Sequence, residues 1–163
     1  MSKERIWQIY DEVGSAACAS GHLKLARQMF TAAVETCGSD NRLSIERAHS
    51  LIGLADTHYL GSDSDEAERL YKRVINLAIR FNVDSGRGRL ILARSLDRLG
   101  SLLMQQGKFA AALKLLQRSA RILEKTALDD SALRQVLLRI SYINTICGDT
   151  DRALETLQQA RAM

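Results

Sequence analysis

The sequence predicts an all-α protein made of four consecutive pairs of antiparallel helices. Three observations lead to this prediction. The 163 residues contain no proline, so no residue removes an amide donor from the interior of a helix. A pattern of small and bulky residues recurs every 41 to 45 positions. Within each copy, apolar residues fall at i, i+3 or i+4, and i+7, which is the spacing of a helix with one buried face.

Four alanines mark the repeat most clearly. They are Ala26, Ala67, Ala112 and Ala153, and the distances between consecutive members are 41, 45 and 41 residues. Twelve positions before each alanine is a small residue: Gly14, Ala55, Gly100 and Ser141. Four positions after each is a bulky residue: Phe30, Tyr71, Leu116 and Leu157. Because two helices approach closely only where both carry small side chains, the small positions predict the crossing points, and the bulky residues should fill the space between pairs.

A predicted turn separates the two helices of each pair. Five positions before each alanine lie Gly21, Ser62 (after Gly61), Gly107 and Gly148. Glycine just past a helix end adopts the left-handed conformation at little steric cost, which closes the helix.

The first four helices are expected over residues 3–19, 22–37, 41–60 and 65–81. The first begins directly in an amphipathic pattern, and Gly21 separates it from the second. Gly38-Ser39-Asp40 gives a stop followed by a cap for the third helix. Ser64 or Asp65, followed by Glu68, resembles a capping box for the fourth.

The last four helices are expected over residues 88–106, 108–125, 131–147 and 150–162. Asp84-Ser85-Gly86 breaks the chain before the fifth helix, and Gly107 separates the fifth from the sixth. Asp129-Asp130-Ser131 caps the seventh, and Gly148-Asp149-Thr150 opens the eighth.

This pattern of small and large residues resembles the tetratricopeptide repeat, a helix–turn–helix unit, over about residues 7–162. The third copy matches best, with Leu96, Leu99, Gly100, Leu103, Gly107, Phe109, Ala112, Leu116 and Ala120. The resemblance implies a right-handed α-solenoid that forms one domain over residues 1–163, with repeats at about 3–38, 40–82, 86–126 and 130–162. The common repeat is about 34 residues long, so each period here is longer by about two or three whole helical turns. Long-period versions occur in kinesin light chains and in bacterial regulators.

Composition excludes several classes of function. A net charge of +4 is a mild basic excess, which by itself does not indicate nucleic acid. Cys18, Cys37 and Cys147 are odd in number and far apart, which favours free thiols over disulfides or a zinc site. No apolar run approaches 18 residues and no export signal precedes the first helix, so we expect no membrane partner and a cytoplasmic location.

Catalytic and cofactor sites are not predicted. His49 and His58 are nine residues apart and lie on different faces of their helix, and His58 falls at a core position, where we expect it to be hydrogen-bonded. The acidic pairs at helix starts are explained by capping. Gly86-Arg87-Gly88-Arg89 lacks the lysine and the preceding strand of a phosphate-binding loop. The chain is therefore not expected to be an enzyme or to hold a metal or cofactor.

In the tetratricopeptide family, the first helix of each pair lines a concave groove. Carried onto this sequence, the resemblance implies a partner-binding groove formed by Asp11, Glu12, Ile52, Asp56, Tyr59, Arg94, Arg98, Met104, Leu138, Arg139 and Tyr142. The first half of this set is acidic and the second half is basic. Arg94, Arg98 and Arg139 are predicted to bind carboxylates of an acidic partner segment beside Tyr142, because guanidinium groups bind carboxylates in bidentate fashion.

The resemblance implies a protein–protein interaction scaffold or adaptor that binds a partner peptide or protein segment in its groove. One alternative is a regulatory receptor for a small signalling peptide. A less favoured alternative is a nucleic-acid-binding repeat protein, because Asp84 and Asp97 interrupt the arginines around the third pair and no aromatic residues alternate with them. The apolar stripe of the last repeat, formed by Leu154, Leu157 and Ala160, is expected to be tolerated at the surface, covered by a partner or used for self-association.

Overall fold

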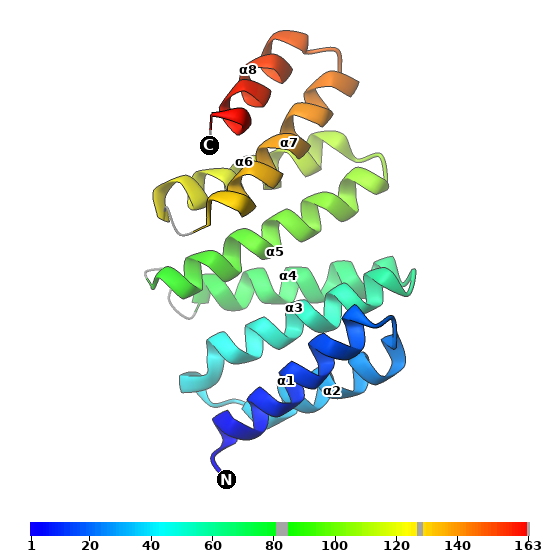
Figure 1. The fold of residues 1–163 in the computed structure, drawn as a ribbon, viewed down its shortest axis with the longest axis vertical. Helices are drawn as coiled ribbons and strands as arrows, with labels where there is room; N and C mark the ends of the chain where they lie inside the picture. The colour runs from blue at the N-terminus through cyan, green and yellow to red at the C-terminus, as the bar shows by residue number, and fades with distance from the viewer. Residues whose placement is uncertain (81–84, 127–128, 163) are drawn as a thin grey trace. The chain divides into compact units, whose positions relative to one another are not determined.

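The computed structural model describes residues 1–80, 85–126 and 129–162, and these form α-helices joined by short turns (Figure 1). The helices are α1 (Lys3–Ala19), α2 (Leu23–Cys37), α3 (Ser44–Leu60), α4 (Ser64–Arg80), α5 (Gly86–Gln105), α6 (Phe109–Thr126), α7 (Asp130–Ile146) and α8 (Thr150–Arg161). A 3₁₀ turn, η1 (Asn41–Leu43), precedes α3. The described residues contain no strand, so the predicted all-α class and the eight helices are confirmed.

The chain divides into two compact units, Met1–Val83 and Asp84–Met163. Each unit holds two of the predicted repeats. In the first unit, α1 packs on α2, α2 on α3, and α3 on α4. In the second unit, α5 packs on α6, α6 on α7, and α7 on α8.

The predicted crossing points lie where the helices of a pair meet. Ala26 and Ala112 are fully buried. A Cβ atom added to Gly14 would lie 3.1 Å from Cδ1 of Phe30, and one added to Gly100 would lie 2.9 Å from Cγ of Leu116. The bulky residue of the second helix therefore lies directly over the small residue of the first.

The fourth pair keeps this crossing although Ser141 replaces the small apolar residue. The Ser141 hydroxyl donates a 2.7 Å hydrogen bond to the carbonyl oxygen of Ala153, the alanine on the opposite side of the crossing. Both residues are buried. The serine is tolerated because its hydroxyl has a partner inside the crossing.

Phe30 also contacts the next pair, as predicted for the bulky position. A Cβ atom added to Gly53 of α3 would lie 2.5 Å from Cε1 of Phe30. Phe30 is 3% exposed. Its ring therefore fills the space between the first pair, α1 and α2, and helix α3 of the second pair.

The turns inside the pairs have the predicted left-handed backbone. The φ angles are 75° at Gly21, 64° at Ser62, 73° at Gly107 and 81° at Gly148. Ser62 is the only residue of this set with a side chain, and a side chain is strained in this conformation.

Replacing Ser62 by glycine should therefore stabilise the protein by up to about 1 kcal/mol, because relief of the steric strain outweighs the greater backbone freedom of glycine in the unfolded chain. Denaturant unfolding followed by circular dichroism measures the change. The matched variant Gly107→Ala introduces the same strain at an equivalent turn and should destabilise by about 1 kcal/mol. A Ser62→Gly variant less stable than the parent would contradict this account.

Two of the predicted helix starts, those of α7 and α8, are capped by the predicted aspartates. Asp40 was predicted to cap the third helix but caps the 3₁₀ turn η1, because α3 begins only at Ser44, after Leu43, which makes no side-chain cap bond. The Asp40 carboxylate accepts a 3.0 Å hydrogen bond from the amide of Arg42. Asp129 accepts one of 3.0 Å from the amide of Ala132. Asp149 accepts one of 3.4 Å from the amide of Arg152.

The starts of α4 and α5 also differ from the prediction. The cap of α4 is Asp63, whose carboxylate accepts from the amide of Glu66 at 3.4 Å, and not Ser64 or Asp65, because the helix already begins at Ser64. Helix α5 begins at Gly86, with Ser85 accepting from the amide of Gly88 at 3.0 Å. Asp84 and the predicted end of the fourth helix at residue 81 lie outside the described residues.

Candidate functional site

One repeat position shows how consecutive first helices are joined. The repeat offsets align Asp11 with Ile52, Asp97 and Leu138. In the first unit, Asp11 of α1 accepts a 2.6 Å hydrogen bond from the hydroxyl of Ser50 in α3. In the second unit, Asp97 of α5 accepts a 2.9 Å hydrogen bond from Nη1 of Arg139 in α7. This position therefore faces the first helix of the following pair.

Asp11 belongs to a polar network inside the first unit. His49 Nδ1 lies 3.2 Å from Asp11 Oδ2, and Trp7 Nε1 donates a 2.8 Å hydrogen bond to the Ser50 hydroxyl. The rings of Trp7 and His49 meet edge to face, with centroids 6.3 Å apart. Asp11 is 7% exposed. Its carboxylate thus links α1 to α3 and offers little surface to a partner.

The predicted carboxylate site at Arg139 already contains a carboxylate of the protein itself. The Arg139–Asp97 pair joins residues of α5 and α7, and the two side chains are 27% and 16% exposed. A partly buried pair with a charged hydrogen bond is stronger than a pair in water. Arg139 therefore stabilises the stacking of the two helices.

Other residues of the predicted set are also used inside their unit. Ile52 is 2% exposed, so the prediction that it contacts a partner is wrong, because a buried side chain presents no surface. The Asp56 carboxylate accepts a 2.5 Å hydrogen bond from the hydroxyl of Tyr71. Glu12 is exposed and accepts from Gln8 at 2.8 Å. Tyr59 and Met104, two further residues of the predicted groove, are half-buried.

Helix α7 carries an exposed apolar stripe, formed by Leu138, Tyr142 and Ile146. These residues are 44%, 56% and 46% exposed, and their spacing of four places them on one face of the helix. Sequence analysis named Leu138 and Tyr142 but missed Ile146. The regular spacing of four was the signal that would have found it.

Basic side chains lie on α5, the first helix of the preceding pair. Arg94 and Arg98 are exposed on α5 and stand one turn apart. The pKa of Asp129 is lowered, chiefly by the hydrogen bond from the Ala132 amide and further by the charge of Arg94. Carboxylates therefore lie among the arginines, and the surface is less basic than the sequence suggested.

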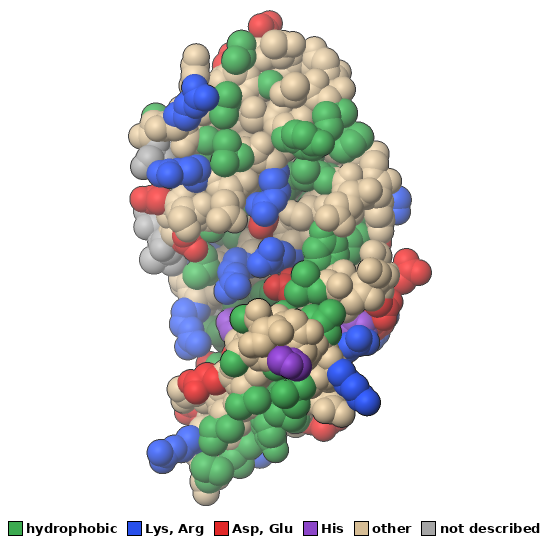
Figure 2. Space-filling view, turned by 45° about the vertical axis from the view of Figure 1, so that its right-hand side comes forward, with side chains coloured by type: hydrophobic (Ala, Val, Ile, Leu, Met, Phe, Trp, Pro, Cys, Tyr) green, Lys and Arg blue, Asp and Glu red, His purple; other side chains and the backbone are tan. Residues whose placement is uncertain are grey.

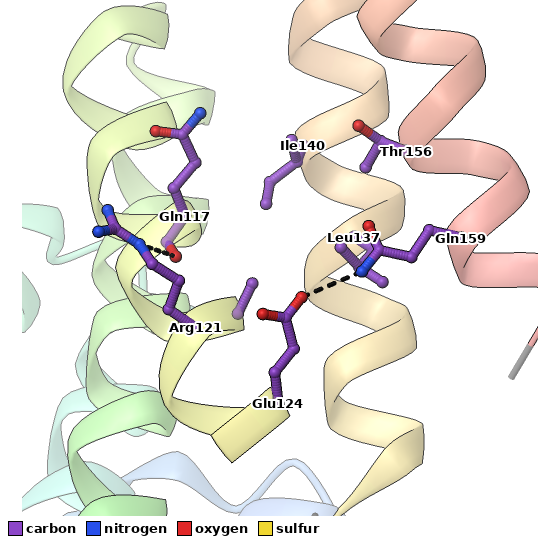
Figure 3. A pocket seen from close by; sticks show the side chains of 8 residues that line it. Gln117, Arg121, Glu124, Leu137, Ile140, Thr156 and Gln159 are labelled. Carbon is purple, nitrogen blue, oxygen red and sulfur yellow. Dashed lines mark hydrogen bonds between the residues drawn. The ribbon is translucent and has the colours of Figure 1, made fainter. Parts of the chain in front are cut away.

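A cleft of about 350 Å³ lies between α6, α7 and α8 (Figure 3). Apolar residues form part of its lining: Ala120, Leu137 and Ile140. At its rim, the side-chain amide of Gln159 donates a 3.0 Å hydrogen bond to Glu124. The cleft was not predicted, although comparing the copies locates it. Val34 and Leu70 of the first unit occupy the positions of Ala120 and Thr156, so the second unit has smaller side chains there.

Replacing Thr156 by leucine should fill this cleft and stabilise the protein by about 0.5–2 kcal/mol. Leu70, at the equivalent position of the first unit, is 2% exposed, which shows that the repeat accommodates the larger side chain. Thermal and denaturant unfolding measure the change. The control is Gln158→Leu, which adds an exposed apolar side chain two residues further along α8 and should leave stability nearly unchanged. Equal stabilisation by both variants would mean that helix propensity, and not filling of the cleft, is responsible.

Two further titratable groups, Asp63 and Cys37, have pKa values that their surroundings explain. His58 Nδ1 lies 2.9 Å from Oδ2 of Asp63, as expected for a hydrogen-bonded histidine, and this contact is the main cause of the lowered pKa of Asp63. Burial raises the pKa of the Cys37 thiol to about 11.

Among the described residues, no three His, Cys, Asp or Glu side chains are grouped in a way that could hold a metal ion. None of the described helices has the length and apolar composition required to cross a membrane.

Comparisons with known proteins agree with this architecture. A family model, Tetratricopeptide repeat, matches residues 91–163. No relative was found among curated protein sequences. The apo form of RapI is similar over 96% of this chain, with a TM-score of 0.86 and 13% identity. A Rap protein complexed with Competence and Sporulation Factor is similar over 98%, with a TM-score of 0.83 and 12% identity. The chain spans 55% of the first of these proteins and 42% of the second.

A third solved structure with a similar fold contains TPR-like repeats. This putative kinesin light chain from Podosopora anserina, described as having nearly identical TPR-like repeats, is similar over 96% of this chain and 74% of its own length. The TM-score is 0.67 and the identity is 20%. At these identities the solved structures establish the fold. The chain thus has the paired-helix fold of tetratricopeptide-type proteins, and its residues 91–163 match the tetratricopeptide repeat family model.

Proposed function

We propose that the chain is a non-catalytic protein-interaction module of the cytoplasm, which binds a segment of a partner protein on the inner helices α5 and α7 of its second unit. The observation that carries the proposal is the α7 stripe of Leu138, Tyr142 and Ile146. Contiguous exposed apolar side chains on a rigid helix are typical of a binding surface. Tyrosine is enriched at interaction sites, and its side chain loses little conformational entropy on binding.

The chemistry of the repeat positions supports this proposal. The equivalents of Leu138 in the first and third copies, Asp11 and Asp97, make polar links between helices. The equivalent of Tyr142 in the third copy is Ser101, whose hydroxyl bonds to the carbonyl oxygen of Asp97. At these positions the first and third copies have polar residues that form hydrogen bonds inside the unit. The fourth copy has Leu138 and Tyr142, which are exposed and would be covered by a partner.

The charge of α5 favours a partner segment that also carries acidic residues. Arg94 is exposed. The charge of Asp97 is compensated by Arg139. An acidic side chain next to apolar ones would then meet Arg94. Because such charge pairs are partly exposed, binding should weaken as salt rises.

The second candidate is a receptor for a small signalling peptide. It is favoured by the likeness in fold to the Rap protein complexed with Competence and Sporulation Factor. The two candidates differ in the size of the ligand, because a scaffold retains whole proteins and a peptide receptor retains a short peptide.

Capture from native cell extract tests the proposal when three forms of the chain are compared. The parent should retain a partner that mass spectrometry identifies as a protein or a short peptide. The double variant Leu138→Ser plus Tyr142→Ser should stay folded, because both side chains are exposed, yet lose most of that partner. The matched control is Leu60→Ser, which alters a residue that is 56% exposed at the end of α3.

Two outcomes decide between the apolar and the charged parts of the surface. If Arg94→Ala lowers capture and removes its salt dependence, an acidic partner segment is supported. If the double variant retains the same partner as fully as the parent, the α7 stripe is not the binding surface and the proposal is wrong.

A further inference from the structure

A second apolar surface lies on the outer face of α1, in the other unit. Ile9 and Val13 are 47% and 41% exposed and lie four residues apart. Figure 2 shows hydrophobic side chains gathered along the N-terminal end of the molecule. These residues serve neither the Trp7–Ser50–Asp11–His49 network nor the α7 stripe.

The repeat shows what this face of a first helix contacts elsewhere in the chain. The equivalents of Val13 are Leu54 in α3 and Ile140 in α7. Leu54 packs against Ala17, Ala26 and Phe30 of the preceding pair. Ile140 is 6% exposed and lines the cleft between α7 and the preceding helix α6. In each unit, this position of the later first helix therefore packs on the pair before it.

The opposite face of the repeat is exposed at α8. Leu154 is 53% exposed, and Leu157 is half-buried. Their equivalents in α2 are Arg27 and Phe30. Phe30 lies over Gly53 of the following helix, and Arg27 Nη2 would lie 3.5 Å from a Cβ atom at Gly61, which follows that helix. In α8, these positions are therefore the ones that would contact a following first helix.

We propose that these two surfaces bind each other between two copies of the chain, with α8 of one copy packed on α1 of the next. The second copy is the occupant indicated because the contact continues an interface that each unit already builds, α2 on α3 and α6 on α7. Leu157 would contact Val13 of the neighbouring copy, because their equivalents Phe30 and Leu54 pack together. Leu154 would lie toward the C-terminal end of that α1, because its equivalent Arg27 lies beside Gly61, which follows α3. The two surfaces differ, so the contact is heterologous and leaves one free surface at each end of the assembly.

Leu138 of the α7 stripe would also lie beside the neighbouring α1, because its repeat position faces the first helix of the following pair. The proposal is therefore tested without any partner protein, by the mass of the chain in solution. Sedimentation equilibrium in reducing agent, which excludes disulfides through the exposed Cys147, should show a mass that rises with concentration above the monomer value of 18.1 kDa. Two variants each remove one surface: Ile9→Asp plus Val13→Asp on α1, and Leu154→Asp on α8. Each alone should be monomeric. Leu60→Asp is the matched control and should associate like the parent.

A mixture of the two variants gives the decisive result. The α1 variant keeps its α8 surface, and the α8 variant keeps its α1 surface, so the mixture should form a dimer of one copy of each and nothing larger. Circular dichroism checks that both variants remain folded. A parent that stays monomeric at its highest soluble concentration would overturn the proposal. So would an α1 variant that associates as fully as the parent, because the α8 surfaces would then be binding each other or the contact would lie elsewhere.

Discussion

Replacing Phe30 by alanine should lower the free energy of unfolding by about 3–5 kcal/mol, which is the usual range for truncating a buried aromatic side chain. Phe30 is 3% exposed and fills the space between Gly14 of its own pair and Gly53 of the next. Because glycine supplies no side chain on either side, neighbouring side chains cannot easily close the resulting cavity. Equilibrium denaturation followed by circular dichroism measures the loss.

The control for this change is Thr31→Ala, which truncates the next residue of the same helix. Thr31 is exposed, so its replacement should change stability by about 0.5 kcal/mol or less. If Phe30→Ala costs no more than this control, the space between the pairs is not filled by the bulky repeat position, and the proposed register of the repeat is wrong.

Replacing Ser50 by alanine should destabilise the first unit by about 1–3 kcal/mol, the cost of leaving a buried polar group without its partner. The Ser50 hydroxyl accepts from Trp7 Nε1 and donates to Asp11. Its removal leaves the indole nitrogen without this acceptor and the buried carboxylate with one donor fewer. Denaturant unfolding measures the loss.

A double-mutant cycle shows whether this cost arises in the network. Trp7→Phe removes the indole donor, so Ser50→Ala should cost less in that background than in the parent. The control Ser15→Ala alters an exposed serine of α1 and should have little effect. Strictly additive costs for Trp7→Phe and Ser50→Ala would contradict the proposed coupling.

Most of the fold could be predicted because its signals are local in sequence. The left-handed turns, including the one at Ser62, follow from spacing alone, and the crossing points follow from residue size. The cap of α4 was placed one or two residues late because Asp63, Ser64 and Asp65 can all cap a helix. Only the backbone geometry selects Asp63, through its bond from the Glu66 amide.

Less of the candidate site could be predicted, because one repeat position has different environments in different copies. Ile52 and Leu138 share a position, yet Ile52 is 2% exposed and Leu138 is 44% exposed. The sequence also could not show that Arg139 binds Asp97, a residue more than a full repeat away. Basic residues counted along α5 and α7 therefore overestimated the positive charge available to a partner.

Methyl NMR of the folded chain tests most directly whether a partner binds the α7 stripe. The captured partner is added to protein labelled at the isoleucine and leucine methyl groups, and the shifts are followed during titration. We expect the signals of Leu138 and Ile146 to move or broaden, while that of Leu60, which is 56% exposed at the end of α3, stays in place. Signals that move only at other exposed residues, such as Leu25 or Leu154, with Leu138 and Ile146 unchanged at saturation, would contradict the proposed function.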